Sequence, residues 1–381
     1  MADTLYEPGN EYFDTIVIGG GQTGLTVGYE LAQRGVDFVI LDANERVGDA
    51  WRKRWDSLLL FTPARYNGLP GMPFPAKSDA FVTKDEVADY LEMYAEANDL
   101  PVRSHTKVTR VGHDGDAYVV EAGGRELRSR NVVVAMADYQ VPHVPDFAPD
   151  LDPGIVQMHS SRYLRPSQLA EGPVLVVGLG NSGADIGLEL TRTRETYISG
   201  TPGAVIPFRI EPWLGRNVGV RLVRFGAVKV LNTGTFIGRK ARPKIMRHTG
   251  SPIVRVKPGD LVAAGAHRVP RVTGVEDGRP VLADGTVLDV ANVVWCTGFR
   301  PGFDWIDLPV FDDQGRPIHE RGVVASQPGL YFCGLFFLHA LWSETLSGMP
   351  IDARYIADHL AARNRTLSPA EGGRVLHPPG R

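Results

Sequence analysis

The chain has 381 residues, 43% of them apolar, which is enough for two compact domains with ordinary hydrophobic cores. Its 41 basic and 44 acidic residues leave a net charge of −3, which gives no sign of a nucleic-acid partner. The two cysteines, Cys296 and Cys333, lie far apart and exclude a disulfide framework or a C-x-x-C pair. The sequence has no signal-peptide pattern, membrane-spanning apolar run or metal-ligand constellation, so we expect a cytoplasmic protein without a membrane span or a metal.

A glycine-rich pattern follows the first apolar segment. Residues 15–19 read TIVIG, a β-branched run typical of a buried parallel strand. Gly19, Gly21 and Gly24 have the G-x-G-x-x-G spacing, which allows a tight turn, close approach to a pyrophosphate and close packing of the next helix. Asp42 ends the following strand, 23 residues after Gly19, where an acid accepts both hydroxyls of an adenosine ribose.

The same arrangement recurs near the middle of the chain. Residues 174–190 read VLVVGLGNSGADIGLEL and place Gly178, Gly180 and Gly183 at the same spacing between a strand and a helix. The residue 23 positions after Gly178 is Thr201, so no acid repels the extra phosphate of NADP there. One such pattern is weak evidence, but two in the strand–turn–helix context favour FAD at the first and NAD(P)H at the second.

The sequence leaves the choice between NADPH and NADH open. The missing acid favours NADPH, but no arginine stands at Thr201 or beside it to bind the 2′-phosphate. The arginines that remain as candidates are Arg192, Arg194 and Arg209.

We therefore predict an α/β fold with two Rossmann-like dinucleotide-binding domains, the NAD(P)-binding one inserted in a discontinuous FAD-binding domain. The FAD-binding domain takes residues 1–165 and 286–381, and the NAD(P)H-binding domain takes residues 166–285. The apolar segments 287–302 and 329–337 are predicted as strands that return to the first domain.

Local signals predict further elements. Thr83 followed by Glu86 is a capping box before a helix that ends near Leu100, and residues 107–136 read as a small meander before a buried strand. Residues 351–364 form a closing helix, and the tail after Leu367 is expected to be loose.

One segment departs from the charge balance. No acidic residue lies between Glu211 and Asp260, whereas apolar residues alternate there with basic ones. The basic residues are Arg216, Arg221, Arg224, Lys229, Arg239, Lys240, Arg242, Lys244, Arg247, Arg255 and Lys257. A solvated helical face is the simpler interpretation, and weak docking on an anionic membrane or an acidic partner is the alternative.

Several motifs resemble the flavin-containing monooxygenases, especially their short bacterial members and the plant auxin-forming branch. Residues 48–75 are similar to the segment beneath the flavin, with Gly48, Trp51 and Thr62 matched and Asp49 in place of a second glycine. The second half of the identifying signature is kept at His159 and Tyr163. Its first half is absent, because the phenylalanine and glycine positions hold Pro153 and Ile155.

The two glycine patterns and the resemblance together give the residues that we expect to contact the cofactors. For FAD these are Gly19, Gly21, Gln22, Thr23, Gly24, Asp42, Gly48, Trp51, Thr62, Val108, Ala135, Thr297, Gly298 and Gly334. For NAD(P)H they are Gly178, Gly180, Asn181, Ser182, Gly183, Thr201 and Arg209. Three positions depart from the pattern: Met136 and Ala137 replace Thr and Gly, and Pro63 replaces an asparagine near the flavin.

The resemblance implies a monooxygenase that uses NAD(P)H, FAD and O2 to oxygenate a small organic substrate through a flavin C4a-hydroperoxide. Such chemistry needs little acid–base machinery, and the sequence identifies no catalytic residue. Amines, sulfides and ketones all remain candidate substrates. The alternatives are a flavin NAD(P)H oxidase or a reductase for a protein carrier, a disulfide reductase, and a non-enzymatic flavoprotein sensor.

Overall fold

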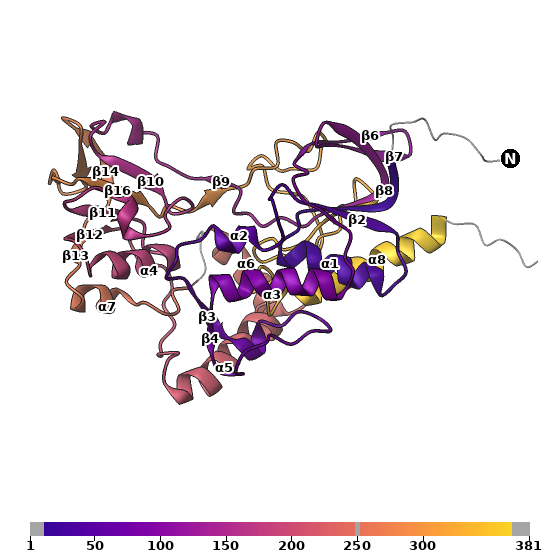
Figure 1. Cartoon of the computed structure of the whole chain (residues 1–381), viewed down its shortest axis with the longest axis horizontal. Helices are drawn as coiled ribbons and strands as arrows, with labels where there is room; N and C mark the ends of the chain where they lie inside the picture. The colour runs from indigo at the N-terminus through magenta and orange to yellow at the C-terminus, as the bar shows by residue number, and fades with distance from the viewer. Residues whose placement is uncertain (1–10, 248–251, 368–381) are drawn as a thin grey trace, which may run out of the picture.

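The structure, a computed structural model, describes residues 11–247 and 252–367. Two lobes are visible in Figure 1, each built around its own β-sheet. The chain passes between them at β9 (Val141–Pro142) and β17 (Phe299–Arg300), which pair antiparallel with each other. The predicted α/β fold with two dinucleotide-binding domains is confirmed.

The first sheet has seven strands in the order β5-β2-β1-β8-β7-β6, with β18 also paired to β8. Its core is parallel: β1 lies between β2 and β8, and β18 runs parallel to β8. The predicted meander is β6, β7 and β8, paired antiparallel. The bounds are β1 Glu11–Ile18, β2 Phe38–Leu41, β5 Val102–Arg103, β6 Val108–Asp114, β7 Ala117–Ala122, β8 Arg125–Val134 and β18 Leu330–Phe332.

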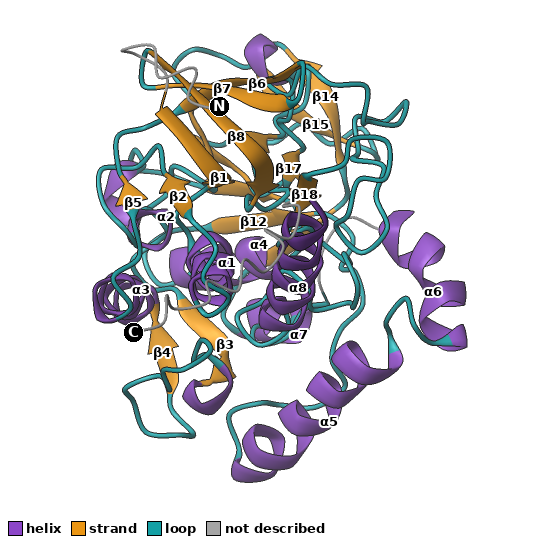
Figure 2. Cartoon of the chain, turned by 90° about the vertical axis from the view of Figure 1, so that its right-hand side faces the viewer, coloured by secondary structure: helices purple, strands orange, loops and turns teal. Residues whose placement is uncertain are grey.

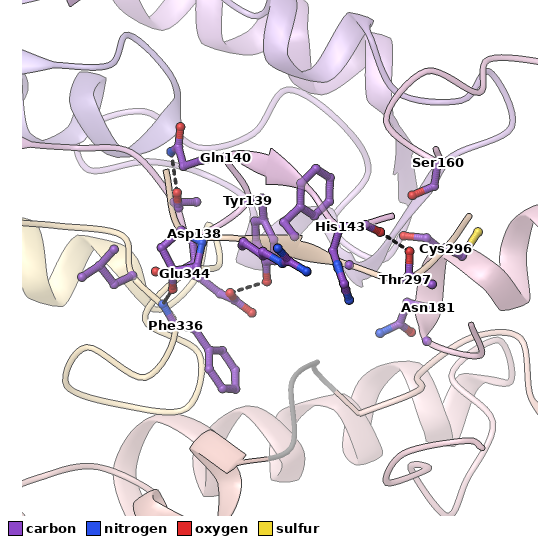
Figure 3. Close-up of a pocket in the computed structure, with 18 of the residues that line it drawn as sticks. Asp138, Tyr139, Gln140, His143, Ser160, Asn181, Cys296, Thr297, Phe336 and Glu344 are labelled. Carbon is purple, nitrogen blue, oxygen red and sulfur yellow. Dashed lines mark hydrogen bonds between the residues drawn. The ribbon is translucent and has the colours of Figure 1, made fainter. Parts of the chain in front are cut away.

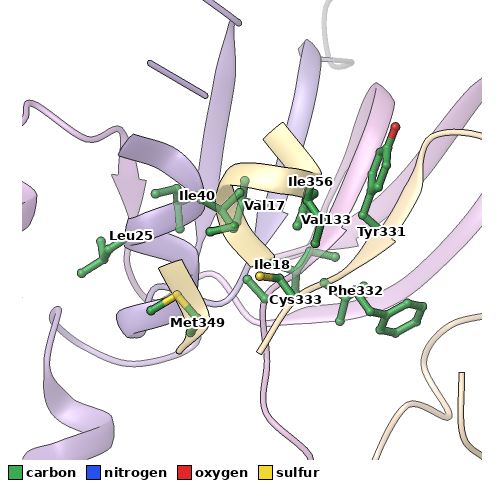
Figure 4. Close-up of a cluster of buried hydrophobic side chains, with 14 of the residues drawn as sticks. Val17, Ile18, Leu25, Ile40, Val133, Tyr331, Phe332, Cys333, Met349 and Ile356 are labelled. Atoms are coloured by element: carbon green, nitrogen blue, oxygen red, sulfur yellow. The ribbon is translucent and has the colours of Figure 1, made fainter. Parts of the chain in front are cut away.

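The helices of the first domain are α1 (Gln22–Ala32), α2 (Asp49–Arg52), α3 (Lys84–Ala97) and α8 (Met349–Leu367). α1 and α8 pack on each other and on the parallel strands, with Leu25 and Ile356 among the apolar side chains that fill the core (Figure 4). The closing helix predicted over 351–364 is therefore confirmed. The predicted tail lies outside the described residues.

The capping box at the start of α3 is also confirmed. The Thr83 hydroxyl accepts a hydrogen bond from the Glu86 amide at 3.2 Å, and the Glu86 carboxylate accepts one from the Thr83 amide at 2.7 Å. Two amides that the helix geometry leaves without a partner are thereby satisfied.

The second sheet has five parallel strands in the order β10-β16-β11-β12-β13. Its strands are β10 Val156–His159, β11 Val174–Val177, β12 Thr196–Ser199, β13 His267–Val269 and β16 Asn292–Trp295. α4 (Asn181–Leu190) and α7 (Pro258–Ala263) cover one face. On the other face lies a hairpin of β14 (Val272–Glu276) and β15 (Arg279–Leu282).

The prediction that segment 287–302 returns to the first domain was wrong. Its strand, β16, pairs with β10 and β11 in the second sheet, and only β18 joins the first sheet. Both strands are short apolar runs, and such a run shows burial without showing which sheet buries it. The second sheet accordingly includes β10, which precedes residue 166, and β16, which follows residue 285.

The remaining elements lie between and below the sheets. A hairpin of β3 (Leu59–Pro63) and β4 (Phe81–Thr83) adjoins α5 (Val220–Phe225), and α6 (Phe236–Arg247) follows along the edge (Figures 1 and 2). π-helical turns at Gly215–Gly219 and Gly226–Val230 flank α5, so the backbone is helical from 213 to 230. Within the described residues, every helix is too short or too polar to cross a bilayer.

Candidate functional site

A cavity of about 2520 Å³ lies between the two domains and is lined by both glycine turns. Pockets for one small ligand measure about 300–1,000 Å³, so this cavity is large enough for two dinucleotides and a substrate. The carboxyl ends of β1, β8, β11 and β16 all lead to its wall. That edge of a parallel sheet is where α/β proteins bind nucleotides.

The first turn joins β1 to α1 and has the geometry that a pyrophosphate requires. Gly19 has φ +107°, a conformation that side chains rarely adopt. A methyl group on Gly24 would lie 1.8 Å from the Gly19 carbonyl oxygen, so α1 can approach β1 only with glycine there. A methyl group on Gly21 would meet nothing within 4 Å and would enter the cavity. Asp42, at the end of β2, lines the same cavity and accepts hydrogen bonds from the Gly20 and Asn44 amides.

The second turn repeats this geometry between β11 and α4. Gly178 has φ +108°, and a methyl group on Gly183 would lie 2.0 Å from the Gly178 carbonyl oxygen. Gly180 again faces open space in the cavity. The Asn181 side chain fixes the turn against residues 252–254 of the same chain, since it donates to the Pro252 carbonyl and accepts from the Val254 amide.

Both turns therefore fit the diphosphate of a dinucleotide. At each turn the glycine nearest the cavity leaves room in front of backbone amides at a helix N-terminus, where an anion is stabilised. At the first turn Asp42, directly after β2, lies where its carboxylate can accept from a ribose. At the second turn Gly200, directly after β12, occupies the corresponding place, and Thr201 follows it in the cavity wall.

Other residues predicted to contact FAD border the first turn. Trp51 donates its indole N–H to the Gln22 side chain at 3.1 Å, and Gln22 donates to the Glu344 carbonyl at 3.1 Å. The Thr62 hydroxyl bonds to the side chain of Asn67 at 2.5 Å, so it is oriented by a buried amide. The predicted residues that line the cavity on this side are Gly19, Gly21, Gln22, Thr23, Asp42, Trp51, Thr62 and Ala135.

Five predicted residues do not line the cavity. Gly24 lies beneath the first turn, Gly48 packs against α3 and Gly334 approaches the Thr23 side chain. Val108 begins β6 and packs at the edge of the first core. Arg209 forms an ion pair with Asp260, which occupies its guanidinium.

Thr297 and Gly298 lie beside the second turn. They follow β16, and a methyl group on Gly178 would come within 2.2 Å of the Cys296 carbonyl oxygen. The Thr297 hydroxyl donates to the carbonyl of His143 across the linker (Figure 3). Both residues line the cavity at the junction between the domains.

His159 joins the same junction from β10. Its Nδ1 accepts from the Ser161 amide at 3.1 Å, which leaves Nε2–H to donate to the Gly298 carbonyl at 2.9 Å. Burial lowers the pKa of His159 and favours this neutral form. Tyr163 is also buried and donates to the Glu189 carboxylate at 2.6 Å. Both residues of the signature thus connect segments of the chain.

A polar cluster in the middle of the cavity was missed by the sequence analysis (Figure 3). The Tyr139 hydroxyl donates to the Glu344 carboxylate at 2.5 Å, and Asp138 accepts from the Phe336 amide at 2.8 Å. Arg54 lines the cavity with them. Tyr139 and Glu344 are 205 positions apart, so no local pattern could have brought them together.

Burial shifts the pKa values of this cluster toward neutral forms. Desolvation is the largest cause of the raised pKa of Asp138 and of the raised pKa of Tyr139, where Glu344 adds to the effect. Tyr139 is 45% exposed, and it lines the cavity. Tyr139 is therefore a hydrogen-bond donor there at neutral pH.

The arginines predicted for the 2′-phosphate are placed elsewhere. Arg194 donates to the carbonyls of Pro166 and Ala170, and Arg192 lies beyond the end of α4. Two other arginines lie in and just after β13, whose following residues Pro270 and Val272 bond to Ser199 at the end of β12. Arg268 donates to the Gly200 carbonyl at 2.8 Å, and Arg271 lines the cavity.

The two turns on separate parallel sheets, opening into one cavity, define a two-dinucleotide oxidoreductase. Residues 16–203 match the family described as pyridine nucleotide-disulphide oxidoreductase. The chain is 38% identical to a CzcO-like oxidoreductase of Geobacillus kaustophilus, over 91% of this chain and 98% of that protein. It is 30% identical to indole-3-pyruvate monooxygenase YUCCA1 of Oryza sativa, over 75% and 76% of the two chains.

A solved structure agrees with these relatives. The flavin-containing monooxygenase from Stenotrophomonas maltophilia matches with a TM-score of 0.74 at 28% identity, over 93% of this chain and 99% of that one. The chain belongs to the flavin monooxygenase family and is an FAD-dependent oxidoreductase.

Proposed function

We propose that this enzyme uses NADPH and O2 to place one oxygen atom on a small organic substrate. The observation that carries the proposal is that the two glycine turns open into a single cavity. The chemistry that bound FAD would supply is electron transfer from a nicotinamide to O2. The first turn with Asp42 would hold FAD, and the second turn with Asn181, Ser182 and Thr201 would hold NADPH.

The chain's own residues would orient the substrate and exclude water. Tyr139 is held by Glu344, and Asp138 by the Phe336 amide, so their positions are fixed before a substrate arrives. The single O–H of neutral Tyr139 is donated to Glu344, so the phenol oxygen offers a substrate a hydrogen-bond acceptor without the negative charge of a phenolate. The sequence names no catalytic residue, and we assign these three residues to substrate positioning.

Arg268 and Arg271 support NADPH rather than NADH. They stand near Thr201, where the 2′-phosphate of an adenosine ribose would lie, and no acid takes the place that Asp42 has in the first domain. Replacing both by glutamine should raise the Michaelis constant for NADPH at least about tenfold, since charged hydrogen bonds contribute about 1.5–3 kcal/mol each. The constant for NADH should change little.

A flavin oxidase or a reductase for a protein carrier is the second candidate. Met136 and Ala137 line the cavity where the family pattern has Thr and Gly, and Pro63 replaces the asparagine near the flavin. A disulfide reductase is disfavoured by the cysteines. Cys296 follows the second sheet and Cys333 the first, and burial raises the pKa of both thiols, that of Cys296 to about 12.

The test combines two measurements on the purified flavoprotein. Anaerobic mixing with NADPH and with NADH follows the loss of oxidised flavin absorbance. Reduced enzyme is then mixed with ¹⁸O2 and a panel of amines, sulfides and ketones, and products are analysed by mass. A product that carries one ¹⁸O supports the proposal. Stoichiometric hydrogen peroxide with no labelled product across the panel would favour the oxidase, and absence of flavin reduction would favour a sensor. A cytoplasmic location stays a prediction.

A further inference from the structure

An apolar stripe runs along the outer face of the helical segment 213–230. Leu214, Val218, Leu222 and Phe225 are separated by four, four and three positions, which places them on one side of a helix. They are between 45% and 67% exposed, and exposed apolar residues that lie together in this way mark interaction surfaces, whereas single ones do not. Trp213, which precedes Leu214 in sequence, and Phe236 and Ile237 at the start of α6 are also exposed.

The stripe is not the side on which this helix packs. Val220, Ala227 and Val228 are buried, and they face the protein through two core clusters. The helix therefore has an inner apolar side that packs on the protein core and an outer apolar side that is exposed to solvent. In Figure 2, α5 and α6 lie at the edge of the molecule, away from both sheets.

The charged residues of the segment itself are all basic, and acidic residues border it at Glu211, which is exposed, and at Asp79, which pairs with Arg216. Arg221 and Lys229 are exposed beside it, and Lys240 is exposed on α6. No acidic residue occurs in residues 212–259, so no carboxylate of this segment offsets them. Arg216 and Arg224 turn inward, where they lie over the rings of Phe81 and Tyr66.

We propose that residues 213–240 form a docking surface for anionic phospholipid bilayers. Apolar side chains that enter the boundary between headgroups and acyl chains, flanked by basic residues that meet anionic headgroups, are the two attractions that hold an interfacial helix. The occupant is a lipid surface rather than a second copy of the chain. A symmetric dimer through this stripe would place Arg221 and Lys229 close to the same cations of the other copy.

Docking would also bring the cavity near the bilayer. Thr233, Arg239, Arg242 and Met246, on and just before α6, line the cavity wall. The docking surface and the wall are thus parts of one helical segment, and substrates dissolved in the membrane would meet this side of the enzyme first.

The test is co-sedimentation of the full-length, FAD-loaded protein with vesicles. We expect binding to phosphatidylcholine vesicles that contain 30% phosphatidylglycerol, and at least about tenfold weaker binding to phosphatidylcholine alone. Because the attraction is partly electrostatic, 0.5 M NaCl should weaken binding severalfold.

Variants separate the two attractions. Leu222→Ser with Phe225→Ser should lower the partition coefficient about tenfold or more, because the apolar contact is removed. Arg221→Gln with Lys229→Gln should lower it more than tenfold on anionic vesicles, at about fivefold per basic residue. Val262→Ser on α7, 56% exposed, and Arg192→Gln with Lys107→Gln are the matched controls and should bind as wild type.

Thermal melting of each variant excludes unfolding as the cause, and the charge variant tests the proposal independently if the apolar variant melts early. Equal binding by wild type, the apolar variant, the charge variant and the controls would overturn the proposal. So would a dimer, measured by analytical ultracentrifugation, that dissociates in the Leu222→Ser, Phe225→Ser variant, because the stripe would then be a contact between copies.

Discussion

Gly180 and Gly183 stand three residues apart in one turn, yet their environments differ completely. A side chain on Gly180 would enter open cavity space, whereas one on Gly183 would collide with the Gly178 carbonyl oxygen at 2.0 Å. We therefore expect Gly180→Val to fold, to keep FAD and to lose reduction by NADPH by about a hundredfold or more, because the valine occupies the space of the pyrophosphate. Anaerobic stopped-flow reduction measures this loss.

The companion variant Gly183→Val should instead lower the free energy of unfolding by about 3 kcal/mol or more, since α4 must move away from β11. Urea unfolding distinguishes the two variants. If Gly180→Val folds but releases FAD, the second turn binds FAD and our assignment of the two turns is reversed.

Asp352 on α8 is only 1% exposed, and burial raises the pKa of its carboxyl to about 6. Its nearest cation, the Arg321 guanidinium, is 3.9 Å away. The unfolded carboxyl ionises near pH 4, so between about pH 4 and pH 6 the folded state binds more protons than the unfolded state. The ionisation of Asp352 in the folded state therefore lowers the free energy of unfolding as the pH rises through this window.

Asp352→Asn should remove that cost. We expect it to increase the free energy of unfolding by about 3 kcal/mol at pH 7.5 and to have almost no effect at pH 4. Urea titrations across this range measure the difference. A constant difference between the two proteins at every pH would show that Asp352 acts through packing instead of ionisation.

At the scale of the element, α3 depends on signals that lie within a few residues of its start. Thr83 accepts from the Glu86 amide, so Thr83→Ala leaves a helix amide without this partner. We expect a loss of about 1 kcal/mol in the free energy of unfolding, measured by urea. Glu86→Gln keeps an acceptor for the Thr83 amide and serves as the control. A loss from the control as large as that from Thr83→Ala would indicate a charge effect at the helix start.

The capping box and the two glycine turns were predictable because their geometry is set by neighbours in sequence. Thr83 needs only Glu86, and Gly24 and Gly183 need only the carbonyl oxygens five positions earlier. The sheet that receives β16 was not predictable, because the choice depends on pairing with β10 and β11 far along the chain. The Tyr139–Glu344 hydrogen bond was out of reach for the same reason, since the two residues come from different parts of the first domain.

At the scale of the whole molecule, the two sheets have separate cores. One hydrophobic cluster surrounds the first sheet, and two others cover the faces of the second. The paired strands β9 and β17 join the lobes, and the cavity lies between the two lobes. Each dinucleotide would bind mainly to one sheet, so each should stabilise mainly one domain.

Calorimetry tests this separation. We expect the FAD-free protein to unfold in two transitions, with FAD at one hundred times its dissociation constant stabilising one domain by about 2.7 kcal/mol. NADP⁺ at the same relative concentration should raise the midpoint of the other transition, and Gly180→Val should abolish only that second shift. If a single transition moves with both ligands, the lobes unfold together. The residues that line the cavity would then couple the two lobes, because the carboxyl ends of both sheets lead to its wall.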